Sequence, residues 1–137
     1  MLVKKNDYKD LSSIANEYAK KGNIVEILPK IHFKDENYKL IFTGAYKNKC
    51  PDLKINNIFY EYESCEKPVN ATKIRNMISR GLKQSDTIII DNTDGATDHY
   101  ILNTIHNRIR SGQKIKEVWL YEQKTVRLLY EKQKPKM

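Results

Sequence analysis

Three acidic residues that could bind a metal ion or move protons lie on two short runs of strand-forming residues. Asp52 belongs to the first run, and Glu61 and Glu63 belong to the second. Between the runs stand Asn56 and Asn57, and Asn tolerates the positive φ that a type I′ turn requires at both central positions. The sequence therefore predicts a two-residue β-hairpin within residues 50–64.

The predicted turn also decides which residues face each other. It places Asp52 opposite Glu61 and Cys50 opposite Glu63, and alternation puts all of them on one face with Lys54. Opposed residues in an antiparallel pair have Cβ atoms about 4.5–5.5 Å apart. Two ionised carboxylates at that distance repel by about 3 kcal/mol at an effective dielectric of about 20. A divalent cation, a raised pKa or a nearby Lys or Arg must offset this repulsion. The other face is apolar and consists of Leu53, Ile55, Ile58, Tyr60 and Tyr62.

Pro51-Asp52, a spacer of eight residues and Glu61-Tyr62-Glu63 together resemble the active-site signature of the PD-(D/E)XK, or restriction-endonuclease-like, nucleases. Within that superfamily the chain is most similar to the nuclease and tRNase toxin domains of contact-dependent growth inhibition proteins. The resemblance implies that Asp52 and Glu61 hold Mg²⁺ or Mn²⁺. It also implies an RNA substrate, with tRNA as one candidate, and a cognate immunity protein as a partner.

The chain departs from this signature at Glu63, which stands where the superfamily has a Lys that helps to activate water. Another cation would have to take that role. Lys54 is one candidate, because it lies on the carboxylate face diagonally across from Glu61, and Lys73 in the next helix is the other. A Glu on the first helix often completes the metal site in these enzymes, and Glu17 is the residue here that matches.

The charge balance points to a polyanionic partner. There are 25 Lys and Arg against 17 Asp and Glu, a formal net charge of +8, and nucleic acid is the commonest polyanion that proteins bind. Four basic residues of the helix after the hairpin are candidates for contacts to phosphates, although the same charges also fit an ordinary solvated surface. They are Lys73, Arg75, Arg80 and Lys83.

At 137 residues the chain is expected to form a single nuclease-like domain over 1–130, followed by a basic, disordered tail over 131–137. No apolar run approaches the roughly 18 residues that a membrane span needs, and the first residues do not resemble a signal peptide. We therefore expect a cytoplasmic protein without a membrane partner, in which Cys50 and Cys65 are free thiols.

Hydrophobic periodicity and end signals predict the order of the elements. This order favours an α/β (or α+β) sandwich with a mixed sheet and an acidic hairpin flanked by helices, and the resemblance implies a restriction-endonuclease-like topology. Besides the central hairpin, the expected elements are a helix from Asp10 to Gly22, a strand over 24–28, a ragged hairpin or a loop over 30–49, a helix capped by Asn70 or Thr72 and reaching Leu82, a buried strand over 87–91, a helix from Thr97 to Gly112, and a hairpin of 117–121 with 125–130.

Three functions stay open at this point. The first is a metal-dependent endonuclease that hydrolyses phosphodiester bonds of RNA. The second is a catalytically degenerate module that binds nucleic acid or protein. The third is a metal-free, barnase-like RNase, which needs His, Glu and a cation together; only Glu63 with Arg75 or His99 suggests such a set. His99 and His106 are otherwise expected at the surface, since no Cys or Asp stands near them at zinc-ligand spacing.

Overall fold

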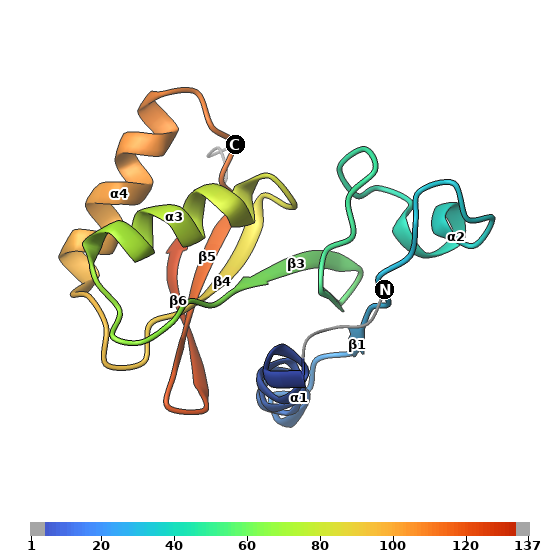
Figure 1. The fold of residues 1–137 in the computed structure, drawn as a ribbon, viewed down its shortest axis with the longest axis horizontal. Helices are drawn as coiled ribbons and strands as arrows, with labels where there is room; N and C mark the ends of the chain where they lie inside the picture. Colours follow the sequence, from blue (N-terminus) through green and yellow to red (C-terminus); the bar gives the residue numbers. More distant parts are fainter. Residues whose placement is uncertain (1–4, 134–137) are drawn as a thin grey trace.

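The computed structural model describes residues 5–133 of the chain, and over this range it is a mixed α/β fold (Figure 1). Six strands within the described residues form one sheet in the order β1-β2-β3-β4-β5-β6. The β3–β4 and β4–β5 pairs are parallel, and the other neighbours are antiparallel. In chain order the elements are α1 (Lys5–Lys20), β1 (Val25–Ile27), α2 (Tyr38–Phe42), β2 (Leu53–Ile55), β3 (Ile58–Glu63), α3 (Ala71–Leu82), β4 (Thr87–Asp91), α4 (Asp98–Arg110), β5 (Glu117–Glu122) and β6 (Thr125–Glu131).

The predicted central hairpin is confirmed. Asn56 and Asn57 have φ of 49° and 69°, and β2 pairs with β3 so that Leu53 faces Tyr60. The ladder ends at that pair, so the expected opposition of Asp52 and Glu61 lies just beyond the last paired residues. The C-terminal hairpin β5–β6 is built in the same way, with a two-residue turn of positive φ at residues 123–124.

Helices cover both faces of the sheet, and the central strand β4 is buried throughout, as predicted. Ile88 and Ile90 pack with α3 and α4 on one face, whereas Ile89 packs with α1 on the other. The predicted helix starts at Asn70 and Thr97 are confirmed, because each side chain accepts a hydrogen bond from a backbone N–H in the first turn of its helix. No helix among the described residues is long and apolar enough to cross a membrane.

Two predicted boundaries were wrong. The first helix begins at Lys5 rather than near Asp10, because no Gly or Pro interrupts the residues before it. Asp10 therefore lies inside α1, and its carboxylate accepts a hydrogen bond from the Tyr62 hydroxyl (2.9 Å). At the other end, β6 runs to Glu131, one residue past the expected strand end at 130, and residues 134–137 of the expected tail lie outside the described range.

The segment 28–52 contains no strand and only one short helix, α2, which stands away from α3 and α4 (Figure 1). Neither half of the ragged hairpin considered for 31–33 and 40–42 forms. Phe42 is buried instead, stacked between Tyr38 (ring centroids 5.0 Å apart) and Phe59 (6.1 Å). This aromatic stack fastens the segment to β3 of the acidic hairpin.

Candidate active site

The central hairpin holds the three carboxylates near one another, and alternation along β3 decides the side of the sheet on which Glu61 and Glu63 lie. Tyr60 and Tyr62 face α1, so Glu61 and Glu63 face the other side of the sheet. Asp52 directly precedes β2, and it is almost as buried as Glu61, with 8% and 7% of their surfaces exposed. Acidic groups are rarely buried to this extent unless they are paired.

Lys30 provides the charge partner of Asp52, and the sequence-based prediction missed it. Its Nζ lies 2.7 Å from Oδ1 of Asp52 and 2.6 Å from the backbone oxygen of Cys50. The other carboxylate oxygen of Asp52 accepts the backbone N–H of Tyr62 (2.9 Å). The signal that could have found Lys30 is the antiparallel pairing of β1 with β2, in which Ile27 faces Leu53. The same register continued past Ile27 brings Lys30 beside the residues that precede β2.

Glu61 is a buried carboxyl group whose bonding capacity is not fully used. Its Oε1 is inaccessible to solvent and has no hydrogen-bond partner among the described residues. Burial raises the pKa of Glu61 well above its usual range, and the Asp52 charge and a hydrogen bond with Glu63 raise it further, while Lys30 opposes the shift. A raised pKa favours the protonated form of Glu61, and it is one of the ways predicted for relieving the repulsion between these carboxylates.

Glu63 is paired with Arg80 of α3. Nε of Arg80 lies 2.9 Å from Oε1 of Glu63, and its Nη2 donates to the Ser64 backbone oxygen (3.1 Å). The helix can come this close because Gly81 has no side chain. A Cβ at Gly81 would lie 3.0 Å from Cγ2 of Ile88 and 3.3 Å from Cγ of Glu63. The cluster therefore contains two acid–base pairs, Lys30–Asp52 and Arg80–Glu63, with Glu61 between the two acidic residues in the sequence of the hairpin.

A cavity of about 710 Å³ lies between the hairpin and the irregular segment, and Glu61 forms part of its wall. Most of the wall comes from residues 30–50, and Gln84, after α3, contributes as well. Titratable and aromatic side chains of the irregular segment thus line the same cavity as the buried carboxyl of Glu61. The lining residues are Lys30, Ile31, His32, Phe33, Asp35, Asn48, Lys49, Cys50, Glu61 and Gln84.

The two lysines expected to replace the superfamily Lys have other contacts. Nζ of Lys54 lies 5.4 Å from the centroid of the Phe59 ring. Nζ of Lys73 donates to the backbone oxygens of Glu66 (2.6 Å) and Pro68 (3.0 Å), which holds the connection before α3 in place. The structure brings Lys30 to Asp52 instead.

Glu17 is not brought to the cluster either. Helix α1 packs on the face of the sheet opposite to Glu61 and Glu63, and the Glu17 carboxylate lies 3.5 Å from Nζ of Lys20. The set considered for a barnase-like RNase is likewise not assembled around Glu63, whose cation is Arg80. Arg75 contacts Thr72, and His99 contacts Asn103 on α4.

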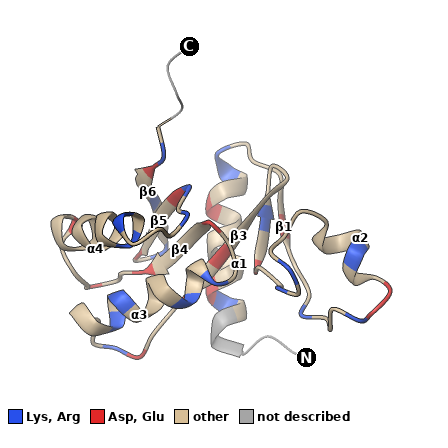
Figure 2. Ribbon diagram, turned by 90° about the horizontal axis from the view of Figure 1, so that it is seen from above, with Lys and Arg blue, Asp and Glu red and all other residues tan. Residues whose placement is uncertain are grey.

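The basic residues expected to contact phosphates are spread along α3 (Figure 2). Lys73 and Arg75 lie near its start, whereas Lys83 caps its end beside Gln84, which lines the cavity. The cavity is thus reached just after the C-terminal end of α3, through Gln84. His99 and His106 are exposed, as predicted.

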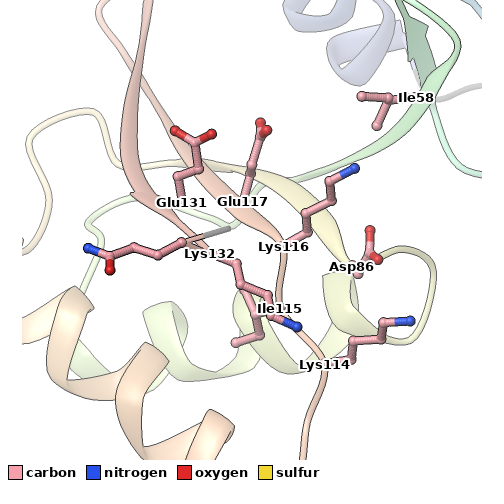
Figure 3. A pocket seen from close by; sticks show the side chains of 9 residues that line it. Ile58, Asp86, Lys114, Ile115, Lys116, Glu117, Glu131 and Lys132 are labelled. Atoms are coloured by element: carbon pink, nitrogen blue, oxygen red, sulfur yellow. The ribbon is translucent and has the colours of Figure 1, made fainter. Parts of the chain in front are cut away.

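A second cavity, of about 390 Å³, lies near the start of β5 and the end of β6 (Figure 3). Glu117 and Glu131 face each other across these strands and point in the same direction (Figure 3). The Glu117 carboxylate already accepts hydrogen bonds from Trp119 (2.7 Å) and Tyr60 (3.3 Å), which makes it a packing element between aromatic side chains. The larger cavity is the better candidate site, because its buried carboxyl has an oxygen without a partner.

Glu61 lines the larger cavity, and Asp52 is close enough for its charge to raise the pKa of Glu61. In the described part of the chain, no group of three or more His, Cys, Asp and Glu side chains is arranged to hold a metal ion. Mg²⁺, however, is usually bound by one or two carboxylates and completes its shell with waters and substrate phosphates. Asp52 and Glu61 are the two carboxyl groups that could take this role.

Comparison of the chain with protein-family models, with curated proteins and with solved structures found no match in any of the three. The functional assignment of this protein therefore rests on the residues of the larger cavity.

Proposed function

We propose that this protein is a nuclease that cleaves phosphodiester bonds of RNA at the cavity beside the acidic hairpin. The observation that carries the proposal is Glu61, a buried carboxyl with an unpartnered oxygen in the cavity wall, next to the Lys30–Asp52 pair. Strongly shifted pKa values in a concave site are typical of catalytic groups. The net charge of +8 suits a polyanionic substrate.

In this proposal Asp52 and Glu61 hold Mg²⁺ or Mn²⁺. The ion, when bound, lowers the pKa of a water molecule and neutralises charge on the phosphate. Glu61 must lose its proton before it can bind the ion, so metal affinity is expected to rise with pH. Lys30 lies in the cavity wall and takes the role of the Lys that the superfamily has at the position of Glu63. Its ammonium group can contact a phosphate oxygen from beside Asp52.

The restriction-endonuclease-like topology and the toxin role belong to the same proposal. Parallel pairing of β3 with β4 and the antiparallel acidic hairpin support it. A toxin of this kind would act in the cytoplasm on RNA, with tRNA as one substrate, and a cognate immunity protein would cover its cavity.

The first prediction tests the site directly. Asp52→Ala and Glu61→Ala should each abolish cleavage of total tRNA in Mg²⁺ or Mn²⁺, because each removes one of the two proposed ligands. The exposed Glu66→Ala is the matched control and should cleave like the unmodified protein. Gel analysis of tRNA and of plasmid, with each ion and with EDTA, measures the outcome. Full cleavage by either site variant would exclude this assignment.

One observation favours the metal-free RNase as a second candidate. His32 lines the same cavity as Glu61 and Lys30, and these are the groups with which an enzyme moves protons without a metal. The set of His32, Glu61 and Lys30 takes the place of the one that the sequence suggested, which was Glu63 with Arg75 or His99. Cleavage that persists in EDTA and is lost in His32→Ala would establish this mechanism. Binding of RNA without cleavage under any of these conditions would instead identify a degenerate binding module.

A further inference from the structure

An aromatic platform lies in the wall of the larger cavity. Phe33 is 42% exposed, a large apolar surface to leave in water, and it lines the cavity together with Glu61. Its ring is stacked on the imidazole of His32, with centroids 4.4 Å apart and planes inclined by 26°. Two flat rings therefore form a short stack that ends at the cavity.

The platform is held in position before any ligand arrives. The backbone N–H of Lys34 donates to Nδ1 of His32 (3.0 Å), which fixes the orientation of the imidazole. The Tyr38 hydroxyl donates to the Lys49 backbone oxygen (2.7 Å), so α2 also anchors Lys49, another residue of the cavity wall. A ring that is already ordered loses little freedom when a ligand stacks on it.

The other lining groups suit a nucleotide. Lys30 and Lys49 bring positive charge into the cavity, and the amide groups of Asn48 and Gln84 can donate and accept hydrogen bonds at a base edge. A volume of about 710 Å³ lies within the range of about 300–1,000 Å³ that is usual for small-ligand pockets. Stacking rings beside basic groups are the features by which proteins bind single strands.

We propose that this cavity takes one unpaired nucleotide of a single-stranded RNA, with its base stacked on Phe33 and its phosphate beside Lys30. A base within a duplex has both faces covered by its neighbours, so duplex RNA offers no surface for this platform. The inference rests on the proposed function for the nature of the ligand. It adds that the substrate is recognised at an unpaired position and that Phe33 is a specificity-determining residue.

Binding can be measured separately from cleavage by fluorescence anisotropy in EDTA. The probe is a labelled, unstructured RNA of about ten nucleotides, within the size that single-strand sites cover, at fixed salt. Phe33→Ala should weaken binding about 5- to 100-fold, the range found when a base-stacking ring is removed. Tyr8→Ala is the matched control, since Tyr8 is 55% exposed on α1 and should bind within twofold of the unmodified protein.

Two further arms make the test decisive. Phe33→Trp should retain binding, whereas Phe33→Leu, which keeps an apolar side chain without a flat ring, should bind like Phe33→Ala. The duplex form of the same RNA should bind more weakly than the single strand. Equal binding by Phe33→Ala and the unmodified protein, or equal affinity for strand and duplex, would overturn the platform. Absence of cleavage in Mg²⁺, in Mn²⁺ and in EDTA by a protein that still shows this binding pattern would refute the nuclease proposal and leave the platform standing.

Discussion

Replacing Glu61 by Gln should make the stability of the protein less dependent on pH. Glu61 is buried beside Asp52, and its pKa is raised in the folded state, whereas in the unfolded chain it returns to about 4.3. At any pH between these two values the folded protein binds one proton that the unfolded chain has lost. The stabilising contribution of Glu61 is therefore complete below about pH 4 and decreases as the pH rises toward the folded pKa.

The size of the effect follows from linkage. One extra proton in the folded state corresponds to a loss of about 1.4 kcal/mol in unfolding free energy per pH unit. Between pH 5.5 and 7.5 the loss is about 2–3 kcal/mol, a large part of the total of about 5–15 kcal/mol typical of a domain. Gln has the shape of a protonated Glu and can donate to Glu63 in its place. Glu61→Gln should therefore gain about 2–3 kcal/mol in unfolding free energy over the unmodified protein as the pH rises from 5.5 to 7.5.

Urea denaturation at pH 5.5, 6.5 and 7.5, in EDTA, measures these free energies. Glu17→Gln is the matched control, because it removes one carboxylate from α1 on the opposite face of the sheet. Its curve should run parallel to that of the unmodified protein. If the Glu61→Gln curve also runs parallel to it, then Glu61 is ionised in the folded state, and the argument from burial and the Asp52 charge is wrong.

Two further predictions concern the contacts that assemble the site. Lys30→Met should lower the unfolding free energy by about 1–3 kcal/mol, because it leaves Asp52 buried without its cation, although the Lys30 side chain is 23% exposed and the full cost of a broken buried pair is not reached. A double-mutant cycle with Asp52→Asn measures this coupling, and purely additive effects would contradict it. Gly81→Ala should cost about 1–3 kcal/mol in thermal or urea unfolding, because its Cβ would press on Ile88 where α3 meets the sheet. Asn76→Ala, at an exposed position of the same helix, is the comparison, and equal stability of Gly81→Ala and the unmodified protein would show that the helix can shift at no cost.

The parts of the fold that were predictable are those determined by residues close together in the sequence. The Asn56-Asn57 turn sets its own φ values and hence the register of the hairpin, and alternation then separates the acidic face from the apolar one. Helix starts at Asn70 and Thr97 are equally local, because each side chain bonds to a backbone N–H within its own first turn.

The cavity was decided by contacts between residues far apart in the chain. Lys30, His32 and Phe33 lie in a segment without hydrophobic periodicity. The pairing of β1 with β2, the stacking of Phe42 on Phe59 and the Lys30–Asp52 ion pair bring that segment to Glu61. Helix α3 lies on the same face of the sheet as Glu63, so its Arg80 pairs with that carboxylate. Glu17 lies on α1 at the opposite face, and Lys73 bonds to the connection before α3. Alternation and capping act over a few residues, whereas the choice of a charge partner depends on which side chains the folded backbone brings within about 4 Å. The carboxylates were thus visible in the sequence, while their cations and the cavity beside Glu61 arise from the packing of distant segments.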